Sequence, residues 1–185
     1  MNEVYVSVDV EADGPIPGMN SMLSLGAAAF QLGNRKPIAT FECNLYTLPE
    51  AVPDQDTMDW WAKQPEAWAE VQKNQQFPSE AMPKFRAWLQ GLPGKPVFVG
   101  FPATYDFMFA YWYMVRFLGT KDQVPFSFAG FDIKTAAAIK LGIPFKDSAK
   151  RNYPKRWFQG CPPHTHKALD DAIGQGILFV NMMAD

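Results

Sequence analysis

Two carboxylates stand at the end of the first apolar run of the chain. The run begins at Val4, is rich in β-branched residues, and leads to Asp9 and Glu11, which are two positions apart. Because side chains alternate between the faces of a strand, both carboxylates leave the sheet on the same face. Neighbouring acids repel each other and lose solvation when buried, unless solvent, a basic group or a divalent metal compensates. A solvated turn also fits this pair when it is taken alone.

Two further acids and a histidine stand at the ends of other predicted elements. Asp106 opens an apolar helix behind the short strand 97–101, and Asp171 lies one turn into the C-terminal helix, behind His166. In α/β sheets, ligands gather at the carboxyl ends of the strands. Four oxygen donors suit two Mg²⁺ or Mn²⁺ ions, which can activate a water and stabilise the leaving oxygen of a phosphodiester. The histidine is then the general base that takes the proton from that water.

Each of these groups also has an ordinary structural explanation. Asp106 could cap its helix, Asp171 could be an acid favoured by the helix dipole, and His166 could lie on the surface. Cys161, His164 and His166 superficially resemble a zinc cluster, but they lack a fourth nearby ligand and have two prolines in the gap. The joint arrangement favours catalysis. The remaining nearby acids are interpreted as structural: Asp13, Asp132 and Asp170.

The elements that must position these groups form an α/β domain with a mixed sheet. Strands are predicted at 4–11, 21–30, 38–48, 97–101 and 126–131, although 25–30 also fits a short buried helix. Helices are predicted from a Thr57 cap, from Pro65, from Ser79, from Tyr105 to Gly119, over 133–141 between Asp132 and Gly142, and over 166–183. Without a repeat or a linker, residues 1–185 are expected to form one domain.

The composition excludes several classes of protein. The 185 residues are 48% hydrophobic and 15% aromatic, which is typical of a globular protein and not of a disordered one. No apolar run is long enough for a membrane span, and the N-terminus lacks the pattern of a signal peptide. Cys43 and Cys161 are too few for a disulfide scaffold. We therefore expect reduced thiols, a cytoplasmic location and no membrane partner.

One segment is strongly basic, although the net charge of the chain is −2. Between residues 146 and 167 six basic residues face one acid, and aromatic residues are interleaved with them. Such a pattern suits a groove that follows phosphates and stacks bases, although a solvated loop explains it equally well. The basic residues predicted to contact a substrate are Lys150, Arg151, Lys155 and Arg156.

The spaced acids and the histidine resemble the three motifs of the DEDD exonucleases, histidine subtype (DEDDh). The matching stretches are Asp9-x-Glu11, Asp106 behind a strand, and His166-x-Ala168-Leu169-x-Asp171. This superfamily includes ribonuclease T, oligoribonuclease and the proofreading subunit of DNA polymerase III. The resemblance implies a ribonuclease H-like fold with a five-stranded mixed sheet flanked by helices. It also implies two divalent cations, Mg²⁺ or Mn²⁺, held by the four acids, with His166 as base.

The implied reaction is 3′→5′ hydrolysis of single-stranded RNA or DNA at its 3′ end, which releases nucleoside 5′-monophosphates. Ala12 stands where the family often has the Thr that meets the terminal nucleotide, and Pro102 stands where it often has Asn. Met22 and Leu23 are candidates for an apolar wedge against the terminal base, or for core positions. The resemblance also makes a homodimer an option.

The stretch around Trp60 and Trp61 is similar to a small bacterial and phage branch of exoribonucleases. Either indole could stack on a base of the substrate, and Trp61 is the one predicted to do so. Packing of both indoles in the core is the alternative. Two other functions stay open at this point. One is a nucleic-acid-binding module without turnover, which the departures at Ala12 and Pro102 suggest. The other is a phosphodiesterase that acts on small nucleotides, which the negative net charge suggests.

Overall fold

Five strands form one mixed sheet in the computed structural model, which describes residues 2–185. The strands are β1 (Glu3–Ala12), β2 (Met22–Phe30), β3 (Ala39–Asn44), β4 (Lys95–Gly100) and β5 (Phe131–Asp132). Their order across the sheet is β3-β2-β1-β4-β5. β2 runs antiparallel to β1 and β3, whereas β4 runs parallel to β1 and β5. The predicted five-stranded mixed α/β sheet is therefore confirmed.

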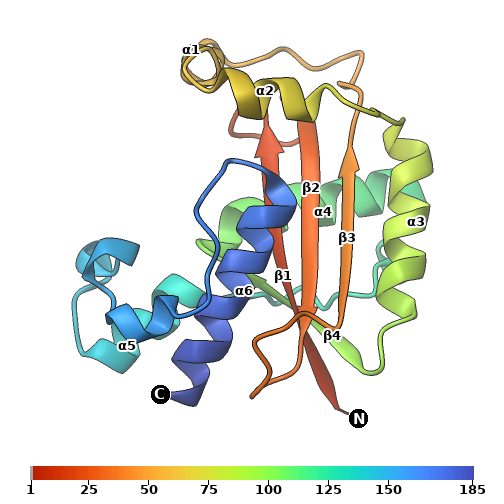
Figure 1. The fold of residues 1–185 in the computed structure, drawn as a ribbon. Coiled ribbons are helices and arrows are strands. Elements are labelled where there is room, and N and C mark those ends of the chain that lie inside the picture. The colour runs from red at the N-terminus through yellow and green to blue at the C-terminus, as the bar shows by residue number, and fades with distance from the viewer. Residues whose placement is uncertain (1) are drawn as a thin grey trace.

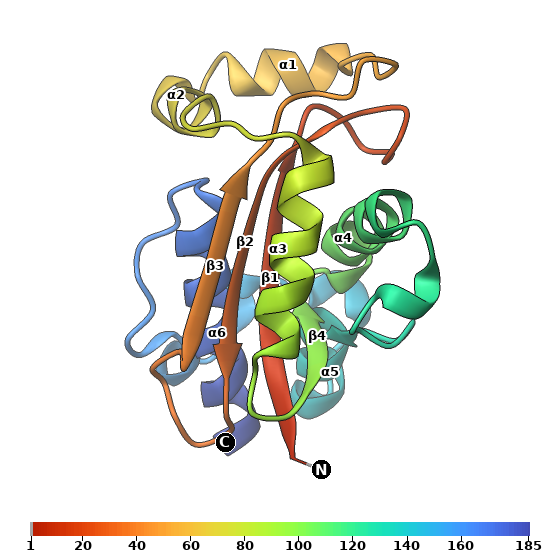
Figure 2. The ribbon, with the colours of Figure 1, turned by 90° about the vertical axis from the view of Figure 1, so that its right-hand side faces the viewer.

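Helices cover both faces of this sheet and one of its ends. They are α1 (Gln55–Trp61), α2 (Pro65–Val71), α3 (Pro78–Gln90), α4 (Ala103–Leu118), α5 (Ile133–Leu141) and α6 (Ala168–Ala184). α6 packs on one face against β1 and β2, and α3 and α4 lie together on the other face (Figure 2). α1 and α2 cross the end at which β1 finishes (Figure 1). The first turn of α6 points toward that same end.

The alternation of β1 decides which of its side chains face α6. Val4, Val6 and Val8 are fully buried and pack with residues of α3 and α4. Burying each such side chain stabilises the fold by about 1.5–3 kcal/mol, so this face of the strand is strongly specified. A slip by one residue would turn Asp9 and Glu11 into that apolar core. The register of β1 therefore holds both carboxylates on the face that α6 covers.

Two glycines let α6 lie unusually close to β2. A Cβ at Gly26 would stand 2.2 Å from the backbone of Ala168, and a Cβ at Gly176 would stand 2.1 Å from the ring of Phe30. Gly26 is also the residue that pairs with Asp9 across β1 and β2. The first turn of α6 thus rests on β2 directly beside Asp9.

A buried amide fixes α6 to β1 as well. The Gln175 side chain donates hydrogen bonds to the Val8 carbonyl at 3.0 Å and to Ser7 Oγ at 3.1 Å. Buried polar groups of this kind are costly when they are left unpaired, so the two bonds select one position of the helix along the strand. Gln175 lies one turn beyond Asp171, and the bonds therefore determine where that acid lies along β1.

Most predicted elements are confirmed, and the differences have local causes. The alternative of a helix over 25–30 is wrong, because these residues pair with both β1 and β3. α1 is capped by Asp54 and not by Thr57: Asp54 Oδ1 accepts the Thr57 N–H at 2.9 Å. α5 has the predicted Asp132 cap and ends at Gly142 in the left-handed region.

The strand predicted at 126–131 is largely wrong. Only Phe131 and Asp132 pair with β4, opposite Val99 and Gly100. Phe126 instead inserts its ring into the core beneath α3, against Phe85 and Phe98. Residues 127–130 are exposed, Phe128 to 87%, so the apolar character of this segment reflects neither strand pairing nor, beyond Phe126, burial. The basic segment behind α5 forms three short 3₁₀ turns, at Phe145–Asp147, Lys150–Asn152 and Lys155–Phe158.

Within residues 2–185, no helix combines the length and the apolar character that crossing a bilayer requires.

The contact at Gly26 generates a first prediction. Gly26→Ala should lower the free energy of unfolding by about 1–3 kcal/mol, because the new methyl group has no space against the backbone of α6. The matched control is Gly174→Ala, whose methyl would meet Pro162 at an ordinary 3.6 Å. In a helix this change is worth up to about 1 kcal/mol of added stability. Urea unfolding of both variants measures the difference, and equal stabilities would contradict the close contact.

Candidate active site

Three acids from opposite ends of the chain meet where β1 ends. Asp9 and Glu11 of β1 and Asp171 of α6 each offer an oxygen, and these atoms lie within 4.8 Å of one another. Asp106, in the first turn of α4, joins them from the other side, because its Oδ1 accepts the Val10 N–H at 3.0 Å. The structure therefore brings together the four acids that the sequence predicts as metal ligands.

Crowding changes the acidity of these carboxyl groups. Burial, followed by the charge of Asp171, raises the pKa of Asp9 to about 7, although Lys150 opposes the shift. Burial, followed by the charges of Asp9, Asp171 and Asp106, raises the pKa of Glu11 to about 9. Burial and Asp9 likewise raise the pKa of Asp106 well above its ordinary value. Full ionisation of the set needs positive charge at its centre.

The donor atoms fit hard divalent cations. All the converging atoms are carboxylate oxygens, which are the ligands that Mg²⁺ and Mn²⁺ prefer. Asp171 Oδ2 is buried and accepts no hydrogen bond from any group in residues 2–185. An unpartnered buried carboxylate oxygen is costly unless a cation binds it. The donor set of Asp9, Glu11, Asp106 and Asp171 therefore suits such ions.

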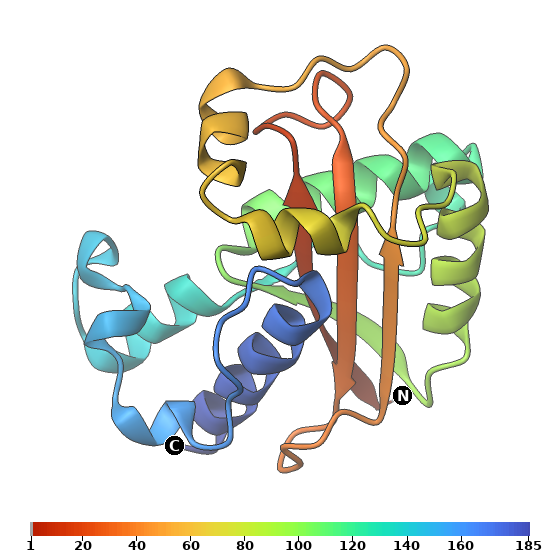
Figure 3. The same cartoon turned by 45° about the horizontal axis from the view of Figure 1, so that its top comes forward.

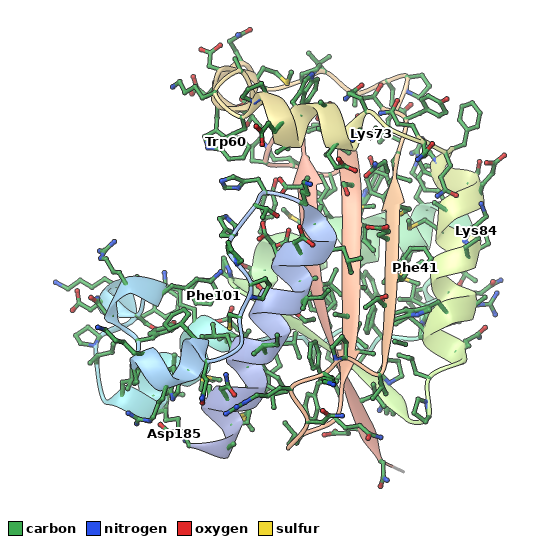
Figure 4. All side chains as sticks on the ribbon, in the orientation of Figure 1. Phe41, Trp60, Lys73, Lys84, Phe101 and Asp185 are labelled. Atoms are coloured by element: carbon green, nitrogen blue, oxygen red, sulfur yellow. The ribbon has the colours of Figure 1, made fainter. Side chains whose placement is uncertain are left out.

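His166 lies in the loop that precedes α6, with its backbone at φ +55°. Its ring meets Trp60 edge to face, with centroids 5.0 Å apart and planes at 88°. Figure 4 shows Trp60 at the end of the sheet that α1 and α2 cross. Burial and then His164 lower the pKa of His166, against the opposing charge of Asp171. The imidazole is therefore neutral near pH 7 and able to accept a proton.

His164 is a neighbour of the site that the sequence analysis did not assign to it. Its Nδ1 lies 2.8 Å from Asp171 Oδ1, and its ring centroid lies 4.3 Å from that of His166. The spacing of two residues between the histidines is the available signal, but in the sequence it suggests only a superficial resemblance to a zinc cluster with Cys161. In residues 2–185, Cys161 does not belong to this group, and its thiol donates to the Gly174 carbonyl at 3.3 Å.

Three predicted substrate contacts are corrected by burial. Met22 and Leu23 are both fully buried, so neither can act as a wedge against a terminal base. Trp61 is 1% exposed and donates its indole N–H to the Ala12 carbonyl at 3.0 Å, which supports the end of β1 from behind. The neighbouring Trp60, 36% exposed, is the indole that faces the site. Ala12 itself is buried, and its carbonyl is occupied by the bond from Trp61.

The segment that carries these tryptophans has its own small core. Leu23, Trp61, Ala67 and Val71 form a buried cluster, separate from the two clusters that line the faces of the sheet. α1 and α2 contain seven residues each, so this cluster and the bond from Trp61 to β1 hold them in place.

Of the basic residues predicted to contact a substrate, Lys150 lies beside the acids and Arg156 lies away from them. Lys150 lines a cavity of about 170 Å³ together with His164 and Asp171, and its charge is felt by Asp9. Arg156 instead binds Asp185 with two hydrogen bonds of 2.5 and 2.7 Å, at the end of α6 remote from Trp60 (Figure 4). A substrate contact at the acids is therefore not supported for Arg156.

The other two basic candidates, Arg151 and Lys155, are exposed on their 3₁₀ turns. These turns lie to one side of α6, away from β3 (Figure 3).

Comparisons with known proteins agree with this geometry. Residues 4–183 match the family described as "3'-5' exoribonuclease Rv2179c-like domain". The 3′-5′ DNA exonuclease Cap18 of Escherichia coli is 35% identical over 185 residues, an alignment that covers 96% of this chain and 90% of that protein. The chain belongs to the Rv2179c-like 3′-5′ exoribonuclease family. It is accordingly a 3′-5′ exonuclease, as its motifs predict, and a hydrolase of the DEDDh superfamily.

Solved structures confirm the ribonuclease H-like fold. The nuclease domain of 3′hExo, a DEDDh family member bound to rAMP, superposes with a TM-score of 0.71 at 11% identity. That match covers 98% of this chain and 92% of the other. S. pombe Pop2p in its Mg²⁺- and Mn²⁺-bound form superposes with a TM-score of 0.67 at 15% identity, covering 97% of this chain and 82% of the other. Divalent cations are thus typical of nucleases with this fold.

The raised pKa values predict how the stability of the metal-free protein depends on pH. The folded state holds the Asp9 and Glu11 protons more tightly than the unfolded chain, in which carboxyl groups titrate near about pH 4. The free energy of unfolding therefore falls as the pH rises from about 4 toward 7 for Asp9 and toward 9 for Glu11. Each group contributes a slope of about 1.4 kcal/mol per pH unit within its window.

Urea unfolding in EDTA, repeated with saturating Mg²⁺, checks this expectation. Mg²⁺ binds the ionised carboxylates and should restore stability at the upper end of the pH range. Asp9→Asn removes one titrating carboxyl, so its slope in EDTA should be shallower. A slope that neither Mg²⁺ nor the substitution changes would mean that the acids do not share a cation site.

Proposed function

We propose that this nuclease hydrolyses the 3′-terminal phosphodiester bond of single-stranded RNA or DNA and releases nucleoside 5′-monophosphates. One observation carries the proposal: three acids from β1 and α6 converge within 4.8 Å, with a fourth bound to the backbone between two of them. His166 lies within the same distance of Asp171 as part of a second group. This combination of oxygen donors and an imidazole is suited to hydrolysis of a phosphodiester.

Asp9, Glu11, Asp106 and Asp171 are proposed to hold two divalent cations, Mg²⁺ or Mn²⁺. When bound, such ions supply charge neutralisation and lower the pKa of a water molecule. The unpartnered Asp171 Oδ2 and the raised pKa of Asp9 support this assignment. Between them, the four side chains offer eight carboxylate oxygens from three different elements, β1, α4 and α6.

The remaining steps belong to side chains of this chain. His166 accepts the proton of the attacking water at a ring nitrogen, and the lowered pKa keeps that nitrogen free of a proton beforehand. The indole of Trp60 limits the orientations of the His166 ring and presents its exposed side to a terminal base. Lys150 is positioned to bind a phosphate of the incoming strand beside the cavity.

The sugar preference is a matter for experiment. The family is described by exoribonuclease activity, whereas the relative at 35% identity is a DNA exonuclease. Both sugars are therefore included in the proposed substrate class. A homodimer and a cytoplasmic location stay predictions from the sequence.

Substitution of one acid and of the base tests the proposed chemistry. With 5′-labelled single-stranded RNA or DNA and Mn²⁺, the wild-type protein should produce a ladder that shortens from the 3′ end. Asp171→Asn should lower the rate by at least about 1,000-fold, since bound metal contributes several kcal/mol. His166→Ala should lower it by about 100-fold or more while metal binding persists, as expected for loss of a general base.

Asp170→Asn is the matched control for this experiment. It removes the adjacent acid, which is hydrogen-bonded to Thr165 Oγ1 at 3.0 Å and not to the acid cluster. Activity should stay close to that of the wild type. Full activity of Asp171→Asn would refute the metal-ligand assignment, and full activity of His166→Ala would refute the base. Faster turnover of dinucleotides than of longer oligomers would instead indicate a phosphodiesterase for small nucleotides.

The division of the basic segment predicts unequal effects of charge removal. Lys150→Gln should weaken single-strand binding and reduce the slope of log K against log salt by about 0.7, the value for one lost phosphate contact. Arg156→Gln removes the same charge from a side chain already paired with Asp185, and it should leave the slope unchanged. Binding titrations in Ca²⁺ over a range of salt provide the comparison. Equal slopes for the two variants would show that Lys150 makes no phosphate contact.

A further inference from the structure

Two imidazoles and one carboxylate form a second group of donors beside the acids. A ring nitrogen of His164, a ring nitrogen of His166 and an oxygen of Asp171 lie within 4.8 Å of one another. His164 Nδ1 lies 2.8 Å from Asp171 Oδ1. His164 and His166 belong to the loop that precedes α6, and Asp171 belongs to the first turn of that helix. Movement of the loop therefore changes the spacing of the donors without disturbing the sheet.

The chemistry of this group differs from that of the acids. Imidazole nitrogens favour Zn²⁺, Ni²⁺ and Cu²⁺, whereas a set of carboxylates alone favours Mg²⁺ and Mn²⁺. Around a tetrahedral Zn²⁺ with bonds of about 2.0–2.1 Å, neighbouring donors stand about 3.3 Å apart. Binding therefore requires His164 Nδ1 and Asp171 Oδ1, at 2.8 Å, to separate slightly, while donors up to 4.8 Å apart move closer. Two nitrogens and one oxygen match a zinc site with three protein ligands.

The position of His164 leaves this group open to solvent. The His164 side chain is 59% exposed, while Asp171 is buried, so an ion can enter from outside and retain a water as its fourth ligand. The cavity of about 170 Å³ borders both residues on that side. Cys161 lines the same cavity, but its thiol donates to the Gly174 carbonyl.

We propose that His164, His166 and Asp171 bind one borderline divalent ion of the Zn²⁺ type, and that this ion inhibits the nuclease. Occupancy engages the ring nitrogen of His166 that would accept a proton, and it draws on the carboxylate of Asp171 that the Mg²⁺ site also needs. The binding site stands on the geometry of the three donors alone. The inhibition rests on the proposed function, because it assumes that His166 and Asp171 serve catalysis.

Binding is tested on the full chain without any assay of activity. EDTA-treated protein is returned to saturating Mg²⁺ at pH 8 and titrated with Zn²⁺ by calorimetry, and with Co²⁺ by visible absorption. The wild type should bind one ion, with a Co²⁺ spectrum that indicates nitrogen ligands. His164→Ala should bind at least about tenfold more weakly, a lower bound taken from the 10- to 100-fold losses caused by removing groups that merely support a ligand. Cys161→Ser, the control, should bind as the wild type does.

Inhibition is tested with the 5′-labelled substrate, and each variant is compared with its own rate in Mg²⁺ alone. Zn²⁺ should inhibit the wild type and Cys161→Ser, and His164→Ala should require at least about tenfold more Zn²⁺ for the same fractional loss. If Zn²⁺ inhibits His164→Ala and the wild type equally, inhibition does not act through this site, and the inhibitory ion binds at Asp9 and Glu11 instead. Unchanged Zn²⁺ affinity in His164→Ala would overturn the site itself. If the wild type does not hydrolyse the substrate, the proposed function fails and the calorimetry still decides the site.

Discussion

The close contact between the first turn of α6 and Gly26 is the constraint on which the site depends. Gly26 pairs with Asp9 across the two central strands, and the backbone of α6 occupies the space that a side chain there would fill. Any larger residue would push the helix outward and carry Asp171 away from Asp9. The hydrogen bonds from Gln175 to β1 then set the position of the helix along the strand. Two contacts thereby bring the two ends of the chain to one point.

The acids oppose folding, and the core compensates for them. Burial and mutual repulsion raise the pKa of Asp9, Glu11 and Asp106, which means that their ionised forms destabilise the metal-free protein. The opposite face of β1 carries fully buried valines, and their burial offsets this repulsion. Alternation along a single strand therefore separates the groups that stabilise the fold from those that bind cations. Such a division is typical of functional sites, where local stability is sacrificed.

Local signals in the sequence were sufficient for most elements and for the acids. Asp132 and Gly142 bound α5 as predicted, and the two-residue spacing of Asp9 and Glu11 placed them on one face. Predictions failed where tertiary burial decides the outcome. Helical spacing cannot tell whether Trp60 or Trp61 faces the solvent, because the answer depends on where β1 and its loop lie. The role of Gly26 depends on a helix about 140 residues away along the chain, which no local pattern reveals.

The separate small core beneath α1 and α2 has a consequence for how this end of the molecule moves. Helices of seven residues are not stable on their own, so their order depends on the cluster around Trp61. Since that cluster is distinct from the cores on both faces of the sheet, detaching it costs less than global unfolding. Trp60 would leave with it, and His166 would lose the indole that its ring meets. Hydrogen exchange of the amides in α1 and α2 therefore reports the opening of this region, which is distinct from the cooperative unfolding of the sheet.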